Sequence, residues 1–522
     1  MKKTLTYLIM IALICNLLFG CNKALPKPEG VTLLDFQLGE SSTFEQDTEI
    51  SYPLDGLLGI PKGDTNPVVF ILHGAHPVED VTETRYYKGF EYLVRHLAEN
   101  GYLAISINMN RAYSLEPIEG IESDRAYNIF KDYYSLLEKA NSGEKIFSYD
   151  LTGKANLDQI NFIGHSRGGD NSLHLTKTLK EQGNSSVQSV LLVAPPFNSP
   201  LEEAYTDIPT GIILPQYDGD VATLNGVEVF NYVYLLDSNR KTPITSAFLY
   251  GGDHSQFNTE LAGRDVLFTY ENVTYITPTE QQDFLKQYAT DFLNHFNFNM
   301  TTTDLIETLG NVAPPRYPVD FMPSIRLPEE KKLVTPNKNL AALKENRPNL
   351  LVEYAEMSIV PTEDTIAPFN HPYALSENMP LYRISWQDNA LELTFPMKNM
   401  DFTSFNYLSL YMANNPTVLL NDDSTPIAFE IELLDMNGHK ASYKLDALKD
   451  SALRYIATPI VNVFEGMDDF SPYWKAKYYT PLSTQIIPLS NFSNLDFRGI
   501  ESITLKGISS SGSIILGGID LY

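Results

Sequence analysis

Residues 164–168 have the composition and spacing of a turn that presents a nucleophilic serine. They read Gly-His-Ser-Arg-Gly, follow the apolar run 160–163 and precede a segment with helical spacing. A strand, Gly-x-Ser-x-Gly and a helix in this order hold the serine on a sharp, exposed turn. The two outer glycines permit a strained backbone and let strand and helix approach closely. The pattern predicts that Ser166 is the nucleophile of an acyl-transfer reaction.

Two later segments supply the base and the acid that such a serine needs. A base must take the proton of the serine hydroxyl, and a carboxylate must orient that base. His254 follows the apolar run 245–250, and Asp218 follows the run 211–214. Open parallel sheets present their sites at the carboxyl ends of the strands. We therefore expect Ser166, Asp218 and His254 to meet at one edge of a sheet, in the chain order serine, aspartate, histidine.

Two aspartates are candidates for the orienting carboxylate. Asp218 stands at the usual distance from its strand, whereas Asp220 lies two residues further on and would require a longer loop. The sequence favours Asp218 and keeps Asp220 as the alternative. Asp253 directly precedes His254 and would point elsewhere, so we expect an ordinary loop carboxylate there.

Backbone N–H groups are expected to bind the oxyanion that forms when the serine attacks. Arg167, the residue after the nucleophile, supplies one, and Ala75 in the loop after an earlier apolar run supplies another. His73 and His76 lie in that loop, and a metal site that they would form is the alternative. Loop histidines more commonly brace the chain through hydrogen bonds, so no metal is predicted. Asp170, in the first turn of the next helix, is expected to cap that helix or to pair with Arg167.

Short apolar runs alternate with segments of helical spacing up to about residue 300. The runs are 68–72, 102–107, 159–163, 189–193, 211–214 and 245–250, and the helical segments are 86–98, 126–140, 170–181 and 281–296. Continuous apolar runs are typical of strands buried on both faces. The alternation indicates a parallel sheet covered by helices. We predict a doubly wound, mostly parallel α/β domain over 25–300, opened by an antiparallel pair near 52–61.

The pattern changes beyond the α/β domain. Prolines and charges dominate 301–348, which predicts an extended connection. Short β-rich runs follow at 407–413, 427–435, 441–444, 485–489, 502–506 and 513–522. Turn residues such as Asn437-Gly438 separate them, so we predict an all-β sandwich over 349–522.

Residues 1–21 have the features of an export signal. Lys2 and Lys3 precede the apolar stretch 5–19. Residues 18–21 resemble the lipobox of bacterial lipoproteins, which implies that Cys21 is lipidated and anchors the protein in the bacterial cell envelope, outside the cytoplasm. The alternative is a signal peptide or membrane anchor that happens to contain a cysteine.

Composition narrows the classes of partner. The formal charge of −27 argues against nucleic acid and against electrostatic binding to anionic lipid surfaces. A lipid anchor would hold the protein at a membrane regardless of that charge. The chain has two cysteines, Cys15 and Cys21. Lipidation of Cys21 would leave no pair for a disulfide, so stability must come from core packing, for which 43% hydrophobic content in 522 residues suffices.

Four segments together resemble the α/β-hydrolase superfamily: His73-Gly74, 164–169, 218–221 and 252–258. The similarity extends over about 51–297. It is strongest to the secreted bacterial branch near the dienelactone hydrolases, platelet-activating-factor acetylhydrolases and cutinase-like polyesterases. The resemblance implies a serine hydrolase of carboxylic esters that works without a metal or organic cofactor. The same scaffold also hosts peptidases and thioesterases, so the substrate stays open.

The last predicted strands resemble those of galactose-binding-like jelly rolls, over 485–492, 500–505 and 512–522. This resemblance implies a module that binds polysaccharide, and a purely structural sandwich is the alternative. The aromatic side chains that would stack on sugar rings are Trp386, Trp474, Tyr473, Tyr478 and Tyr479. Aromatic residues are more commonly core or interface residues, which keeps both alternatives open.

Two functions from different classes follow from these patterns. The first is an envelope-anchored serine esterase: His254 takes the proton of Ser166, Asp218 orients the imidazole, and an acyl-enzyme forms and is hydrolysed. The second is a non-catalytic surface lipoprotein that binds carbohydrate or another ligand on a hydrolase scaffold. The complete set of serine, aspartate and histidine favours the esterase.

Overall fold

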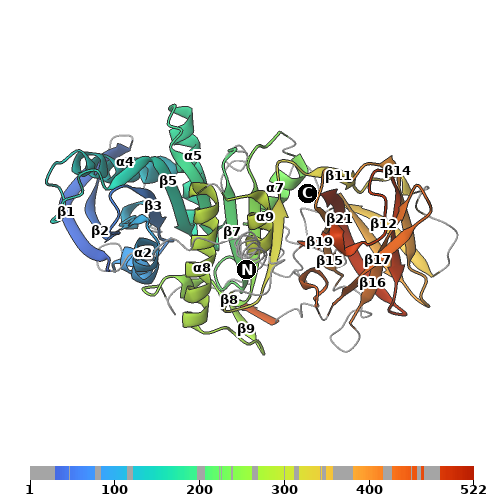
Figure 1. Ribbon diagram of the computed structural model, residues 1–522. Helices are drawn as coiled ribbons and strands as arrows, with labels where there is room; N and C mark the ends of the chain where they lie inside the picture. Colours follow the sequence, from blue (N-terminus) through green and yellow to red (C-terminus); the bar gives the residue numbers. More distant parts are fainter. Residues whose placement is uncertain are drawn as a thin grey trace, which may run out of the picture.

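The computed structural model shows an α/β region and an all-β region side by side (Figure 1). The described residues are 30–45, 48–76, 84–113, 122–196, 206–222, 224, 226–236, 239–261, 268–298, 300–310, 317–340, 343, 349–356, 380–415, 426–447, 449–454, 460–463 and 482–522. Two predictions lie outside them: the lipobox at Cys21, and the aromatic segment with Tyr473, Trp474, Tyr478 and Tyr479.

One nine-stranded sheet organises the α/β region, in the order β1-β2-β4-β3-β5-β6-β7-β8-β10. Its strands are β1 (Thr32–Glu45), β2 (Thr48–Ile60), β3 (Asn66–Leu72), β4 (Leu103–Ile107), β5 (Ala155–His165), β6 (Val187–Val193), β7 (Thr210–Tyr217), β8 (Ile244–Asp253) and β10 (Phe321–Arg326). The pairs from β4 through β8 are parallel. The strands β1, β2 and β10 pair antiparallel. The predicted mostly parallel α/β sheet is confirmed, and β1 with β2 forms its antiparallel opening.

Helices pack on both faces of this sheet because its central strands are apolar on both sides. In β3, Val68, Phe70 and Leu72 lie in one core, and Val69 and Ile71 lie in the other. The first core also contains buried residues of α4 (Glu122–Asn141), α5 (Arg167–Glu181) and α7 (Val227–Leu236). The second contains those of α2 (Glu91–Glu99), α8 (Pro278–Asn297) and α9 (Thr302–Leu309).

The shorter helical elements of the α/β region include α3 (Asn110–Tyr113), the 3-10 turn η3 (Ser255–Phe257) and the 3-10 turn η2 (Tyr86–Phe90). This turn forms the start of the helix predicted over 86–98. Within the part of the chain that the structure describes, no helix is both long enough and apolar enough to cross a membrane.

The proline-rich interval 301–348 is not simply an extended connection. Its described residues include helix α9, strand β10 and strand β11 (Lys331–Val334). The first sheet therefore extends past the predicted boundary at residue 300. Pro323 lies within β10, which is an edge strand of the sheet. A proline is tolerated in an edge strand, because its missing N–H removes no hydrogen bond between strands. The prolines of this interval are therefore compatible with a strand at the edge of the sheet.

The all-β region consists of two antiparallel sheets. One has the order β12-β13-β21-β15-β19, with β11 paired to β21, and the other has the order β14-β20-β16-β17. The strands are β12 (Leu350–Glu356), β13 (Pro380–Trp386), β14 (Glu392–Met400), β15 (Tyr407–Asn414), β16 (Ala428–Asp435), β17 (Lys440–Asp446), β19 (Ser483–Pro488), β20 (Ile500–Gly507) and β21 (Gly512–Leu521). A single core joins Ile384 and Leu410 of the first sheet to Leu393 and Ile431 of the second. The predicted β sandwich is confirmed.

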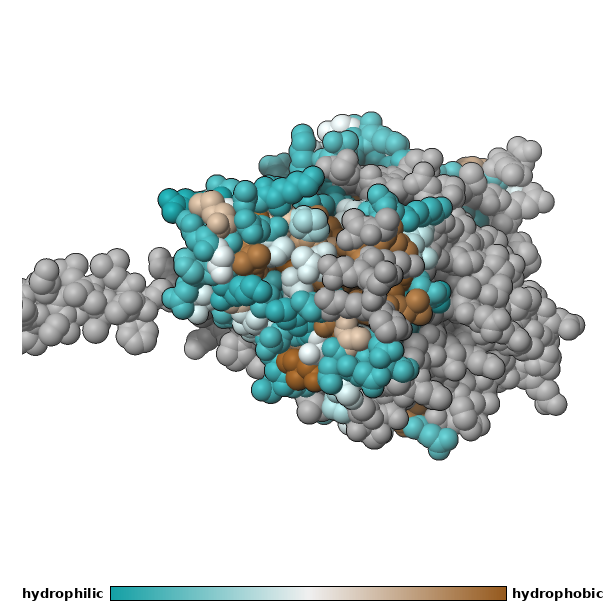
Figure 2. Space-filling view, turned by 90° about the vertical axis from the view of Figure 1, so that its right-hand side faces the viewer, coloured by the Kyte–Doolittle hydropathy of each residue, from teal (hydrophilic) through white to brown (hydrophobic). Residues whose placement is uncertain are grey.

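Direct contacts join the two regions. The Tyr234 hydroxyl of α7 donates to Asp520 of β21 at 2.7 Å, and the Tyr411 hydroxyl of β15 donates to Asn231 at 2.7 Å. Strand β9 (Phe268–Glu271) pairs antiparallel with β18 (Ile460–Val463). The described part of the face in Figure 2 is mainly hydrophilic with scattered apolar residues, as is ordinary for a protein surface.

Candidate functional site

Ser166 occupies the junction between β5 and α5. Its φ of 52° and ψ of −125° are unfavourable for a residue with a side chain. Backbone hydrogen bonds hold this conformation, because Ser166 N–H donates to Val193 at 2.8 Å and Gly169 N–H donates to the Ser166 carbonyl at 2.8 Å. Strain of this kind is characteristic of functional positions. The geometry is the one that the sequence pattern predicts.

The glycines on either side of Ser166 are required by close backbone packing. A Cβ atom on Gly164 would lie 2.2 Å from the Gly168 carbonyl oxygen, and one on Gly168 would lie 2.4 Å from the His73 carbonyl oxygen. The loop after β3 also packs against Ser166, since a Cβ on Gly74 would lie 2.8 Å from Ser166 Cβ. The loop that contains Ala75 is therefore adjacent to Ser166. The backbone N–H groups of Ala75 and Arg167 stay the predicted oxyanion donors.

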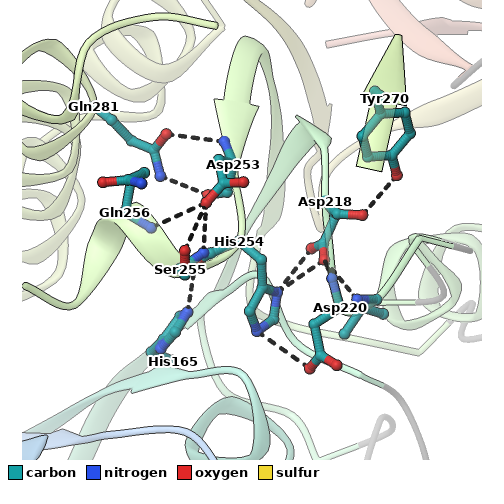
Figure 3. A network of polar contacts seen from close by, with 10 residues as sticks. His165, Asp218, Asp220, Asp253, His254, Ser255, Gln256, Tyr270 and Gln281 are labelled. Atoms are coloured by element: carbon teal, nitrogen blue, oxygen red, sulfur yellow. Dashed lines mark hydrogen bonds and ion pairs between the residues drawn. The ribbon is translucent and has the colours of Figure 1, made fainter. Parts of the chain in front are cut away.

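Asp218 and His254 form a buried pair beyond the ends of β7 and β8 (Figure 3). His254 Nδ1 lies 2.9 Å from Asp218 Oδ1 and 3.0 Å from Oδ2. Asp218 Oδ1 also accepts from the backbone N–H groups of Asp220, at 3.0 Å, and Val221, at 2.5 Å. A carboxylate that accepts three donors is well placed to hold Nδ1–H and to orient the imidazole.

His165 connects the turn of Ser166 to the loop of His254, a role that sequence reasoning missed. Its Nε2–H donates to the His254 carbonyl at 3.0 Å, and the two ring centroids are 4.9 Å apart. Burial, together with nearby His254, lowers the pKa of His165 well below its ordinary value, so the ring is neutral. Because His165 directly precedes Ser166, the strand that ends at Ser166 supports the loop that contains His254. The one available signal was a histidine at the first variable position of the motif.

A second set of bonds fixes the chain around His254. Asp253 Oδ1 accepts from the Ser255 N–H and hydroxyl, both at 2.9 Å. Gln281 of α8 clamps Asp253: its Oε1 accepts the Asp253 N–H at 2.9 Å and its Nε2 donates to the Asp253 carbonyl at 2.6 Å (Figure 3). Asp253 is thus a loop carboxylate, as the sequence predicts, and Gln281 is a further supporting residue.

Asp220 lies on the other side of the imidazole. Its Oδ2 is 3.5 Å from His254 Nε2, and its side chain is 25% exposed (Figure 3). Burial is the largest cause that raises the pKa of Asp220, and the charge of Asp218 adds to it. The structure therefore places Asp218, not Asp220, at Nδ1, and brings a carboxylate to each ring nitrogen.

The two loop histidines brace the backbone. Met109 N–H donates to His73 Nε2 at 2.9 Å, so His73 Nδ1 carries the hydrogen and donates to the Gly74 carbonyl at 2.8 Å. His76 Nε2 donates to the Asn110 carbonyl at 3.1 Å. Burial, with His76 nearby, lowers the pKa of His73 to about 3. Among the described residues, no three histidine, cysteine or acidic side chains are grouped as metal ligands would be.

Arg167 has a partner that the sequence did not indicate. The Arg167 guanidinium pairs with Glu122 of α4 at 3.1 Å, and Asn171 donates to the same carboxylate at 3.0 Å. The residue at the N-cap position of α5 is Ser166, and Asp170 is buried in the first turn. The helix that carries Glu122 is distant in sequence, so local spacing could not reveal this pair.

Of the two alternatives kept open for Trp386, the structure shows the core position. Trp386 is buried in the core of the sandwich, and its indole N–H donates to the Ser509 carbonyl at 3.1 Å. A depression of about 520 Å³ lies between α9 and the all-β region. Phe405, Tyr407 and Phe497 line it beside polar Thr403 and other residues.

Comparison of the chain with known proteins adds no family to this picture. No model of a known protein family matches it, and a search of curated proteins finds no similar sequence. A function is therefore inferred from the geometry around Ser166, His165, His254, Asp218 and Asp220.

Proposed function

We propose that the protein is a serine hydrolase that cleaves carboxylic esters, with Ser166 as nucleophile, His254 as base and Asp218 as the orienting carboxylate. The observation that carries this proposal is that the turn of Ser166 is joined to the pair of His254 and Asp218. The strained turn that holds Ser166 is hydrogen-bonded through His165 to the loop of His254, whose Nδ1 binds Asp218. The resemblance of the site segments to α/β-hydrolases agrees with it.

The first half-reaction would form an acyl-enzyme. Ser166 Oγ attacks the ester carbonyl carbon while its proton passes to His254 Nε2. The backbone N–H groups of Ala75 and Arg167 bind the resulting oxyanion. Collapse of the tetrahedral intermediate breaks the bond to the alcohol oxygen, which takes the proton from Nε2 and leaves.

The second half-reaction would reverse these proton transfers with water. Water attacks the acyl carbon and gives its proton to His254 Nε2. The bond to Ser166 Oγ then breaks, Oγ takes back the proton, and the carboxylic acid leaves. Asp218 stabilises the imidazolium in both halves, so these residues complete the reaction without a further group.

Covalent labelling with a fluorophosphonate probe tests the proposal. Ser166→Ala should abolish labelling, because the probe reacts with an activated serine hydroxyl. Ser142→Ala is the matched control: Ser142 is exposed at the end of α4 and donates to Lys139. Labelling of Ser166→Ala at the parental rate, or no labelling of the folded parent, would contradict the proposal.

The proposed location is the bacterial cell envelope, with the protein anchored by lipid at Cys21. The support is the lipobox-like sequence at 18–21. An anchored esterase would act on esters outside the cytoplasm, and the β sandwich would be carried with it.

A further inference from the structure

We propose that Asp220 is a second carboxylate partner of the His254 imidazole and sets the acid limit of the pH range in which His254 acts as the base for Ser166. This inference rests on the proposed function. Asp220 Oδ2 lies 3.5 Å from Nε2, whereas Asp218 binds Nδ1 on the opposite side of the ring (Figure 3). Nε2 is the nitrogen that receives the serine proton. Asp220 is thus a positioning residue that acts through the base.

A single turn places both carboxylates. Asp218 Oδ1 accepts the Asp220 N–H at 3.0 Å and the Val221 N–H at 2.5 Å, which fixes the chain directly after Asp218. The Tyr270 hydroxyl donates to the Asp218 carbonyl at 2.6 Å and holds the turn from β9. The position of Asp220 is therefore a consequence of the same bonds that place Asp218 on Nδ1.

The second carboxylate changes the number of protons that His254 and its partners hold. When Nδ1–H donates to Asp218, the neutral imidazole presents a lone pair at Nε2. A carboxylate oxygen at 3.5 Å from that lone pair is favourable only if a proton lies on one of the two groups. The His254 and Asp220 pair therefore retains one proton, on Nε2 or on the carboxyl. Nε2 can accept the proton of Ser166 only after this proton has left.

The surroundings of the pair favour retention of that proton. Burial and the negative charge of Asp218 raise the pKa of Asp220, and His254 and Arg167 oppose the shift. Arg167 is itself paired with Glu122. His165 is neutral and donates to the His254 backbone, and burial raises the pKa of Asp253, whose carboxylate accepts from Ser255.

The test measures how Asp220→Asn changes the pH dependence of labelling. The substitution keeps the shape of the side chain but removes the charge that stabilises a proton on Nε2. We expect the acid limb of the labelling rate to move to lower pH by about one unit. An opposite charge within about 4 to 6 Å shifts a pKa by about one to three units, and we expect the smaller shift because Asp220 is partly exposed. Asp220→Glu, which restores a carboxylate, should keep the limb near the parental position.

The control is Asp158→Asn, which removes one charge from an exposed position on β5 and should leave the acid limb in place. A second measurement does not require catalysis. In the full chain with Ser166→Ala, NMR of isotopically labelled histidine, with the His254 signal identified by His254→Gln, should show that Asp220→Asn lowers the midpoint of His254 titration.

The outcomes separate this inference from the proposed function. Ser166-dependent labelling with an unchanged acid limb and an unchanged His254 midpoint in Asp220→Asn would overturn the role of Asp220 and leave the hydrolase proposal standing. No Ser166-dependent labelling in any variant would overturn the hydrolase proposal. The NMR midpoint would then decide by itself whether Asp220 holds a proton with His254.

Discussion

Each region of the molecule contains an aspartate that binds Nδ1 of a histidine from within a turn. In the α/β region this is Asp218 with His254, and in the sandwich it is Asp435 with His439, which ends the turn between β16 and β17. The distance from carboxylate oxygen to Nδ1 is 3.0 Å in both pairs. In both, the aspartate also accepts two backbone N–H groups of its own turn.

The surroundings of the two pairs are opposite. The His254 side chain is fully buried, and Asp220 lies next to its second ring nitrogen, Nε2. The His439 side chain is 61% exposed. His254 is tied through His165 to a strained serine, whereas Asp435 receives a further backbone N–H from Asp496 at 2.9 Å. An aspartate and histidine pair is thus a common way to fix a turn. Burial and a serine on a strained turn are what make one of the pairs a candidate site.

The strongest test of this difference exchanges the two aspartates for asparagine, one at a time. We expect Asp218→Asn to slow labelling of Ser166 by about 10⁴-fold, because an amide no longer holds Nδ1–H and the imidazole adopts the wrong tautomer. Asp435→Asn should leave the labelling rate within about twofold, since the hairpin of Asp435 and His439 has no described contact with the residues around Ser166. The measurement is the rate of probe labelling near neutral pH.

Equal losses of labelling in the two variants would contradict this difference, because they would show that both substitutions reduce labelling by impairing folding. Circular dichroism and the midpoint of thermal unfolding of each variant distinguish that case. For Asp218→Asn we expect a loss of labelling far larger than any shift in the unfolding midpoint accounts for, whereas Asp435→Asn should shift the midpoint without a loss of labelling.

The sequence allowed the strand ends of the candidate site to be predicted for a physical reason. Strands buried on both faces require continuous apolar runs, so the ends of β5, β7 and β8 are visible in the chain, and Ser166, Asp218 and His254 follow them directly. The sequence favoured Asp218 as the orienting carboxylate, but the approach of Asp220 to Nε2 was not predictable. It depends on the turn from Asp218 to Val221, in which two residues of spacing place Asp220 across the ring.

Other features depend on contacts between distant segments. The bond of His165 to the His254 carbonyl joins residues 89 positions apart. Helix α7 was not predicted because its sequence, VEVFNYVYLL, is apolar almost all round and lacks the polar face that marks a surface helix. Its Tyr234 and Asn231 contact the sandwich, which explains that composition.

Glycines of the two regions offer a second, smaller test. A Cβ on Gly168 would meet the carbonyl oxygens of His73 and Leu72 at 2.4 and 2.6 Å, and backbone cannot easily move away. We expect Gly168→Ala to destabilise the α/β region by roughly 3 kcal/mol. Gly438, in the turn that ends with His439, has a φ of +83° and no atom within 4 Å of a built Cβ. Its replacement by alanine should cost about 1 kcal/mol, from backbone strain alone.

Urea unfolding of the two variants measures these costs. Gly168→Ala should also reduce labelling, because a shift of the Gly168 backbone displaces the turn of Ser166, whereas Gly438→Ala should not. A smaller cost for Gly168→Ala than for Gly438→Ala would show that the contact between α5 and the loop after β3 is looser than the structure indicates.

The smallest expected effect concerns the pH dependence of the sandwich. Burial opposes ionisation of Asp435, but hydrogen bonds from the backbone of Asp496 and His439 outweigh it and hold the pKa of Asp435 well below its ordinary value of 3.8. Because the folded-state pKa is depressed, the ionised carboxylate stabilises the fold above about pH 4, and this contribution is lost as the pH falls through the folded-state pKa.

Asp435→Asn should therefore lower the thermal midpoint most near pH 6, and its difference from the parent should shrink on acidification. Glu501→Gln, at an exposed position on β20, is the control. A difference between parent and Asp435→Asn that does not change with pH would mean that Asp435 stabilises its turn through shape and not through charge.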